Sequence, residues 1–88
     1  MLIAKVVGHV VSTQKDANLV GCKLLIVAPL ERKGEVSDRI GLAVDAVGAG
    51  YGETVMLAQG SAARLAIDNT NAPVDLAIIG IVDTVEIE

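Results

Sequence analysis

Glycine dominates the stretch that decides the fold, Asp45-Ala46-Val47-Gly48-Ala49-Gly50-Tyr51-Gly52-Glu53, and returns in a second stretch, Gly60-Ser61-Ala62-Ala63-Arg64. Glycine is favoured where the backbone must reach positive φ or pass close to another backbone. A catalytic loop would also carry a nucleophile, a base or metal ligands, and these two stretches offer only Ser61, Arg64 and two carboxylates. The combination favours a chain that packs tightly against copies of itself.

The rest of the chain is rich in aliphatic side chains for its size. Its 88 residues predict a single domain over residues 1–88, and a folded monomer of this mass exposes roughly 4,900 Å². Apolar residues make up 52% of the sequence, with 13 Val, 8 Ile and 9 Leu, and Tyr51 is the only aromatic residue. The core of so small a domain does not need this many apolar side chains. Because obligate homo-oligomer interfaces resemble a domain core cut in half, the surplus predicts a subunit interface.

Charge and cysteine content argue against several classes of function. The net charge is −4 and the seven basic residues are spread along the chain. Nucleic-acid binding needs a clustered basic surface, and single-strand binding adds aromatic stacking platforms. The single cysteine, Cys22, excludes an intrachain disulfide and fits a reducing cytosol, and its apolar strand pattern predicts a buried, inert thiol.

No targeting or membrane-spanning segment is predicted. The amino terminus lacks a basic leader, and the longest apolar run, 76–82, is far shorter than the roughly 20 residues that span a bilayer. We therefore expect a cytoplasmic protein without nucleic-acid or membrane partners.

Most of the chain alternates with period two, which is typical of strands. Strands are predicted over 2–13, 22–31, 40–47, 53–59 and 74–87, and a short helix over 62–67. Ser61 is expected to cap this helix, and polar loops are expected over 12–21 and 68–73. Five strands with one short helix before the last predict an all-β fold, a small, partly closed antiparallel barrel, and closure would also protect exposed sheet edges. The first and last strands are apolar on both faces, so the second face of each is expected to meet another subunit.

The polar residues form no recognisable catalytic, cofactor or metal site. His9 is the only histidine, and with Cys22 it falls short of the three or four ligands that zinc needs, so it is expected on a strand surface or at an interface. The stretch 48–53 begins like a dinucleotide fingerprint but carries a glutamate in place of the third glycine and precedes a strand, which favours a tight turn. Ser61 is not part of a nucleophile elbow, because Ala63 occupies the position of the second glycine.

Arg64 is the only basic residue in the second half of the chain, and it lies among small apolar residues. Its guanidinium is suited to an ion pair with a carboxylate such as Asp45, Asp75 or Asp83, within the chain or across an interface. The alternative is a solvated helix residue. The carboxylates themselves, Glu53 included, show no acid–base spacing, so solvation or interface pairing is expected for them.

Five short motifs, in order along the chain, resemble those of the EutN/CcmL-type vertex proteins of bacterial microcompartment shells, found in carboxysomes and metabolosomes. They are Val11-Ser12-Thr13-Gln14-Lys15, Gly21-Cys22-Lys23-Leu24-Leu25, Asp45-Ala46-Val47-Gly48-Ala49-Gly50, Gly60-Ser61-Ala62-Ala63-Arg64, and Pro73-Val74-Asp75 followed by Gly80-Ile81-Val82-Asp83. The resemblance covers essentially the whole chain. It implies a five-stranded barrel related to the oligonucleotide-binding fold, assembled as a homopentamer.

Such pentamers fill the five-fold vertices of a polyhedral shell whose facets are hexameric proteins of another fold. The resemblance therefore implies a structural protein with no catalytic activity and no cofactor. The candidate residues for intersubunit packing or the central axis belong to the two glycine-rich stretches and are Gly48, Ala49, Gly50, Gly60, Ser61, Ala62 and Arg64.

Gly50 is further expected to adopt positive φ in a packed loop, so that Gly50→Val impairs assembly. Two other classes of function stay open. One is a binding module of the oligonucleotide-binding fold, which the acidic charge and the single aromatic residue disfavour. The other is a small enzyme, for which no reactive group is found.

Overall fold

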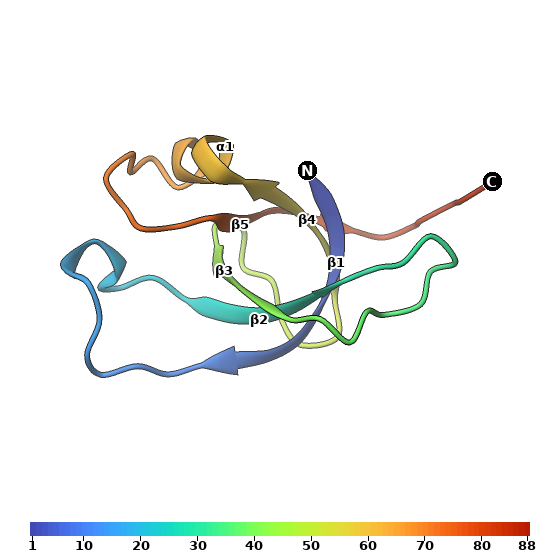
Figure 1. Ribbon diagram of the computed structural model, residues 1–88, viewed down its shortest axis with the longest axis horizontal. Coiled ribbons are helices and arrows are strands. Elements are labelled where there is room, and N and C mark those ends of the chain that lie inside the picture. The colour runs from blue at the N-terminus through green and yellow to red at the C-terminus, as the bar shows by residue number, and fades with distance from the viewer.

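Five strands close into a barrel in the computed structural model, which describes residues 1–88 (Figure 1). The strands are β1 (Leu2–Val10), β2 (Leu24–Pro29), β3 (Gly41–Asp45), β4 (Thr54–Gln59) and β5 (Leu76–Val82). One α-helix, α1 (Gly60–Ala66), and one turn of 3-10 helix, η1 (Ala17–Leu19), lie outside the barrel. The predicted five-stranded barrel with one short helix is confirmed.

Around the barrel the strand order is β1-β2-β3-β5-β4, and β4 pairs again with β1. Four of the five neighbouring pairs are antiparallel, as predicted. The fifth is not, because β3 and β5 run parallel and are joined only at Val44–Ala77 and Asp45–Ile78. Parallel pairing requires a long crossover connection, and the segment that contains β4 and α1 provides it.

β1 takes part in two pairings because it bends. Its first residues, Leu2–Lys5, pair with β4, whereas Ala4–Val10 pair with β2. The register shifts between Val6 and Gly8, which leaves Val7 as an extra residue. A bulge of this kind bends a strand and increases its twist. The second half of β1 thereby diverges from β4.

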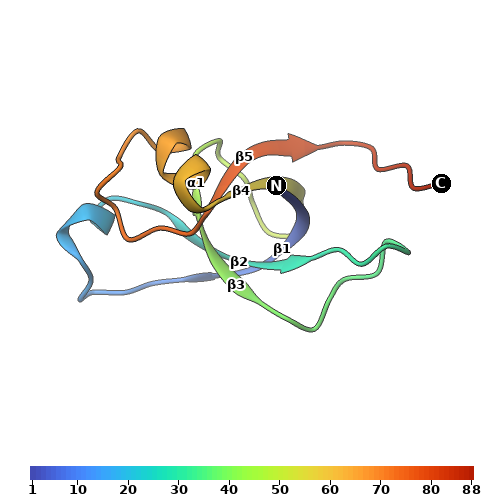
Figure 2. The ribbon, with the colours of Figure 1, turned by 45° about the horizontal axis from the view of Figure 1, so that its top comes forward.

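The apolar core has two parts that share the barrel wall. One fills the barrel and consists of Ala4, Val6, Leu25, Val27, Ala43, Ala49, Val55, Leu57 and Ile78. The other includes buried residues from β4, α1 and β5 and consists of Val44, Ala58, Ala63, Ala72, Val74 and Ala77. Figure 2 shows α1 beside β4 and β5, the two strands that it contacts.

The ladder between β1 and β2 is shorter than the sequence pattern predicts. Val10 and Leu24 form its last pair, so β1 ends before Thr13 and β2 begins after Cys22. Cys22 is consequently half-buried next to the second core cluster, and the prediction of a buried strand thiol is wrong. The predicted polar loop between the two strands is present, with η1 as an unpredicted turn inside it.

β5 is also shorter than predicted. Its last residue, Val82, pairs with Thr54, the first residue of β4, and no strand of the chain lies beyond that point. Residues 83–88, part of the predicted strand 74–87, instead form a tail that leaves the barrel (Figures 1 and 2).

α1 begins directly after β4 and not at the predicted residue 62. Gly60 has a φ of 58°, and this left-handed conformation, which glycine adopts readily, turns the chain from strand to helix without a linker. The Gly60 N–H donates to the Asp75 carbonyl at 2.9 Å. Ser61 therefore lies inside the helix, and Gln59 holds the cap position without a side-chain hydrogen bond. The prediction that Ser61 caps the helix is wrong.

The molecule is elongated, with extents of 42 × 23 × 20 Å, and exposes 5647 Å², compared with roughly 4,900 Å² for a monomer of its mass. The loop 11–23 lies at one end, and the hairpin 30–40 and the tail lie at the other (Figure 1). Sixteen large hydrophobic side chains are exposed. The apolar surplus predicted from composition is therefore on the surface. Neither helix is long and apolar enough to cross a membrane.

Candidate subunit interface

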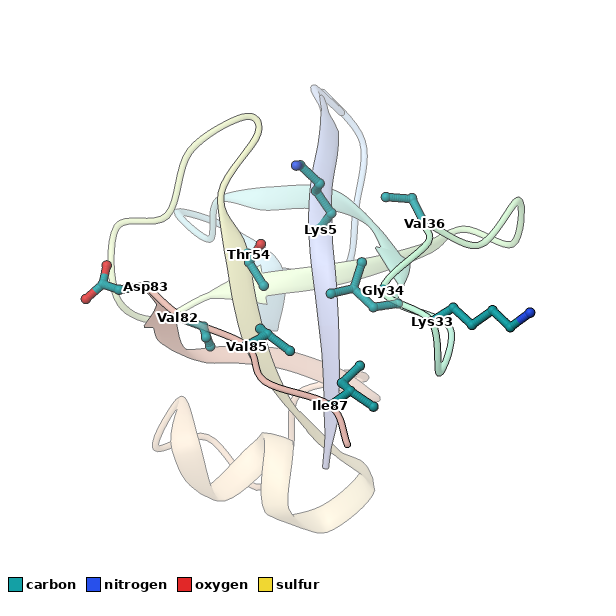
Figure 3. A pocket seen from close by; sticks show the side chains of 10 residues that line it. Lys5, Lys33, Gly34, Val36, Thr54, Val82, Asp83, Val85 and Ile87 are labelled. Atoms are coloured by element: carbon teal, nitrogen blue, oxygen red, sulfur yellow. The ribbon is translucent and has the colours of Figure 1, made fainter.

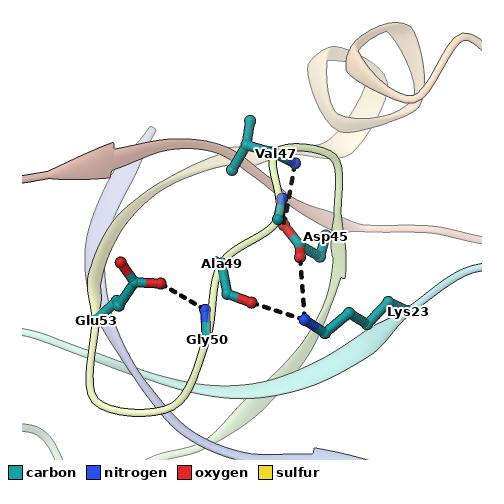
Figure 4. Close-up of polar contacts among 7 residues, drawn as sticks. Lys23, Asp45, Val47, Ala49, Gly50 and Glu53 are labelled. Carbon is teal, nitrogen blue, oxygen red and sulfur yellow. Dashed lines mark hydrogen bonds and ion pairs between the residues drawn. The ribbon is translucent and has the colours of Figure 1, made fainter.

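The glycine-rich stretch 46–53 folds into its own barrel. Ala49 is 0% exposed and belongs to the cluster that fills the barrel, whereas Tyr51 is 81% exposed. In Figure 4 the loop crosses the space that the strands enclose. The sequence predicts a tight turn between two strands at this point, and the structure shows a longer loop whose middle residue completes the core.

Two side chains hold the first half of this loop through its backbone (Figure 4). Asp45 Oδ1 accepts hydrogen bonds from the N–H groups of Val47 and Gly48, at 3.1 and 3.0 Å. Lys23 Nζ donates to the Ala49 carbonyl at 2.8 Å and lies 3.7 Å from Asp45 Oδ2. The Asp45 side chain is only 2% exposed. Its carboxylate is therefore satisfied within its own chain.

Glu53 holds the second half of the loop. Its Oε1 accepts from the Gly50 N–H at 2.7 Å, while its own carbonyl accepts from the Val6 N–H at 3.0 Å. The Gly52 N–H in turn donates to the Val6 carbonyl at 2.9 Å. Positive φ occurs at Gly48 and Gly52, at 85° and 84°, and not at Gly50. The prediction that Gly50 adopts positive φ is wrong.

The sequence reasoning missed what Asp45, Glu53 and Lys23 do. It assigned the two carboxylates to solvation or interface pairing and gave Lys23 no role. For Asp45 a signal was available, because an aspartate shortly before a glycine is typical of a turn in which the side chain accepts from the following backbone. Nothing in the spacing indicates that Lys23, 26 residues away from Ala49 in sequence, reaches the same loop.

α1 presents a short surface of small residues. Ser61 and Ala62 are exposed and Gly60 is half-buried, whereas Ala63 is buried against the barrel. Leu65 is exposed on the same short helix. These residues offer an apolar surface on which a neighbouring backbone can approach closely.

Arg64 ties α1 to the loop that follows it. Its Nη1 donates to the Val74 carbonyl at 3.0 Å. The one ion pair of the chain joins Lys23 and Asp45, so Arg64 makes no ion pair with a carboxylate of its own chain. A pair across an interface stays a prediction.

A groove of about 540 Å³ lies between the first glycine-rich stretch and the end of α1. Gly48 lines it from the loop, residues 66–68 line it from the end of α1, and Lys23 and Asp45 line it as well. The structure thus brings Gly48 close to the last turn of α1. Residues 60–62 lie at the other end of the helix and do not line this groove.

The remaining polar groups form no cluster that points to metal or covalent chemistry. No group of three or more His, Cys, Asp or Glu side chains is close enough to hold a metal ion. Every buried side-chain nitrogen or oxygen has a hydrogen-bond partner. His9 is exposed on β1, which confirms the prediction of a strand-surface histidine. Apolar surface is what the chain presents instead, for example Ile3 and Met56, which are exposed and paired across the β1–β4 ladder.

Comparison with known proteins finds close relatives across the whole barrel. Residues 1–83 match the family model described as "Ethanolamine utilisation protein EutN/carboxysome". The chain is 49% identical over 87 residues to the carboxysome shell vertex protein CcmL of Synechocystis sp.. That alignment covers 99% of this chain and 87% of the CcmL protein. It is 50% identical over 88 residues to the bacterial microcompartment shell vertex protein PduN of Salmonella typhimurium, and the alignment covers 96% of this chain and 97% of PduN. Among solved structures it matches GrpN, a pentameric microcompartment shell protein from Rhodospirillum rubrum, with a TM-score of 0.87 at 46% identity over 98% of both chains.

Proposed function

Because the chain belongs to the EutN/CcmL family of bacterial microcompartment proteins, we propose that it is a structural shell protein whose homopentamers cap the five-fold vertices of a polyhedral microcompartment. The observation that carries this proposal is the match to GrpN, a pentameric shell protein, over 98% of both chains. The two chains are 46% identical and align over almost their full length. The surfaces that join GrpN subunits into a pentamer therefore have counterparts in this chain.

The exposed apolar surface supports the proposal independently. In a ring of identical subunits each subunit presents two different surfaces, one to each neighbour. Exposed apolar side chains occur in the loop 11–23 at one end of this elongated molecule, and in the hairpin 30–40 and the tail 83–88 at the other. Monomeric proteins rarely leave so much large apolar surface open, whereas a ring of five covers it.

Small residues of the two glycine-rich stretches form the proposed interface or central axis. They are Gly48, Gly50, Gly60, Ser61 and Ala62, with Arg64 next to them. Side chains of this size let neighbouring backbones converge around an axis. Ala49 contributes only through the shape of its loop, because its side chain is buried in its own barrel.

The partners of the pentamer are proposed to be hexameric shell proteins, and its place the microcompartment shell. A flat hexagonal sheet cannot close into a polyhedron, so five-fold units are required at the vertices. This role needs neither catalysis nor nucleic acid. The alternative of a nucleic-acid-binding module of the same fold is not favoured, because the relatives are shell vertex proteins.

Native mass spectrometry tests the assembly. The expected mass is about 45 kDa, five times the 9.0 kDa of one chain. Ala62→Glu, which places a charge on the proposed interface, should reduce the pentamer fraction, and Thr70→Glu, at an exposed residue of the loop after α1, should leave it unchanged. A stable 9.0 kDa monomer of the unmodified chain at micromolar concentration would contradict the proposal.

Co-expression with shell hexamers tests the vertex role itself. With this chain present, electron microscopy should show closed polyhedral particles, and without it open sheets or tubes. Closed particles in equal number with and without the chain would refute the vertex assignment even if the chain is pentameric.

A further inference from the structure

The barrel closes but leaves several stretches of strand edge unpaired, and one of them is at the end of β5. β5 pairs with β4 along its whole length but with β3 only at Ala77 and Ile78. From Ile79 to Val82 it therefore has no ladder on the β3 side. The tail 83–88, which continues in the same direction, has no ladder on either side.

Another unpaired edge is the later half of β1. Pairing with β4 covers Leu2–Lys5, and the backbone bonds of Val6 to residues 52 and 53 extend it by one residue. The bulge at Val7 then directs the strand away. From Gly8 to Val10, β1 is paired with β2 on one side and has no hydrogen-bonded partner on the other.

The tail has the sequence pattern of a strand although it lacks a partner. Residues 85–88 read Val-Glu-Ile-Glu, which alternates β-branched apolar residues with acidic ones. Val85 and Ile87 are both exposed. They line a groove of about 460 Å³ between the tail and the hairpin, where Val36 forms part of the opposite wall (Figure 3). No other segment of the chain fills this groove.

The tail is acidic, and the β1 edge carries no acidic side chain that would repel it. Asp83, Glu86 and Glu88 give the tail three carboxylates within six residues. Residues 7–11 contain no Asp, Glu, Lys or Arg. Both edges also present apolar side chains, since Val7 and Val11 are exposed. The edges are therefore free of like-charge repulsion and alike in apolar character, which suits two paired strands.

A single chain cannot bring these edges together. In both views the later half of β1 runs towards the end of the molecule that carries the loop 11–23, and the tail runs towards the opposite end (Figures 1 and 2). In a ring, however, two different surfaces of one chain meet between neighbours. The partner that fits the tail is thus a second copy of this chain.

We propose that the tail 83–88 of one subunit adds as a strand to residues 7–11 of the next subunit, which comprise the free edge of β1 and the residue that follows it. This inference rests on the proposed pentamer and names the contact that links its subunits. Backbone hydrogen bonds provide the affinity in strand addition, and alternate side chains provide the fit. The pairing also protects two open edges that would otherwise be sites of aggregation.

Hydrogen exchange on the assembled pentamer tests the proposal directly. Amides of residues 84–88, which have no ladder within their own chain, should exchange at least about tenfold more slowly than those of residues 13–15, an exposed segment of the same chain that serves as the internal control. A pentamer in which the tail exchanges as fast as the control would overturn the strand pairing and leave the proposed function standing. A monomer would refute the proposed function itself.

Disulfide trapping provides a second test that needs no assumption about strand direction. In a Cys22→Ser background, Ile87→Cys is combined with Val7→Cys or with Val11→Cys. One of the two pairs should give covalent species up to the pentamer under oxidising conditions, and which one does so reports whether the strands are parallel or antiparallel. Ile87→Cys with Ala17→Cys, an exposed residue outside the β1 edge, should give none. Failure of both β1 pairs, or equal trapping with the control, would contradict the inference.

Discussion

The loop 46–53 and the tail 83–88 each follow the end of a strand, but their backbones are satisfied in different ways. The loop is held by Lys23, Asp45 and Glu53, and its middle residue is part of the core. The tail makes no hydrogen bond within its own chain and leaves its apolar residues exposed. Two of the three glycines in the loop, Gly48 and Gly52, adopt positive φ, which lets the loop fold into the barrel of its own subunit. The unmet need for a partner lies in a segment of ordinary strand residues.

The largest effect on the subunit is expected from a charge at the centre of the loop. Ala49→Asp places a carboxylate at a position with 0% exposure inside the barrel. An unpaired buried charge destabilises by about 3–5 kcal/mol, which for a domain of this size removes much of the stability. Urea unfolding at a fixed protein concentration should show a large loss of stability or no folded protein at all.

The matched control is Ala17→Asp, in which the same change is made at an exposed alanine. Its free energy of unfolding should stay within about 0.5 kcal/mol of the parent. A well-folded Ala49→Asp protein with parent-like stability would break the comparison, because the loop would then not be part of the core.

The next largest effect is expected at Gly48. Its φ of 85° lies in the left-handed region, where a β-branched residue is strained, so Gly48→Val should cost about 1–3 kcal/mol. Gly50→Val should cost less, because Gly50 has no positive φ and an added Cβ would lie 3.5 Å from Glu53 Oε1, an ordinary contact distance. Thermal unfolding of the two variants at equal concentration decides the order. The reverse order would restore Gly50 as the critical glycine.

A smaller effect is expected from removing the loop's first anchor. Asp45→Ala deletes the acceptor for two backbone N–H groups and should lower stability by about 0.5–2 kcal/mol, the range found when similar side-chain caps are removed. Asp45→Asn keeps an acceptor oxygen and should retain part of that stability. If the two variants were equally destabilised in urea, the contact with Lys23 at 3.7 Å would be the important one instead of the hydrogen bonds.

Sequence patterns predict the architecture well because alternation and turn residues are local. The barrel, the helix after β4 and the surplus of apolar surface are all predicted from them and confirmed. What the patterns miss depends on distant partners. The end of β5 is set by the position of Thr54, the anchor at Ala49 comes from Lys23, and the sharp entry into α1 depends on Gly60, so that Ser61 no longer caps it.

The same limit explains why alternation alone overextends the last strand. The pattern of residues 83–88 is that of a strand, and the chain lacks only the neighbour to pair with. A period-two sequence reports the capacity to pair, and it carries no information on whether the partner is in the same chain. The mismatch between pattern and structure is in this case the signal that points to another subunit.

The smallest effect on the stability of a single subunit is expected from substitutions in the tail. The same substitutions should have a clear effect on assembly, which separates the role of the tail from that of the loop. Replacing Val85 and Ile87 together by Thr keeps the β-branched shape and removes apolar surface that touches no core cluster. The circular dichroism spectrum should be unchanged, and the barrel's intrinsic stability should stay within about 0.5 kcal/mol of the parent, as for other exposed substitutions. The pentamer fraction in native mass spectrometry should nevertheless fall on dilution, because the tail is needed between subunits and not within one. Loss of the folded spectrum would show that the tail stabilises the barrel itself. An unchanged pentamer fraction would show that other residues join the subunits.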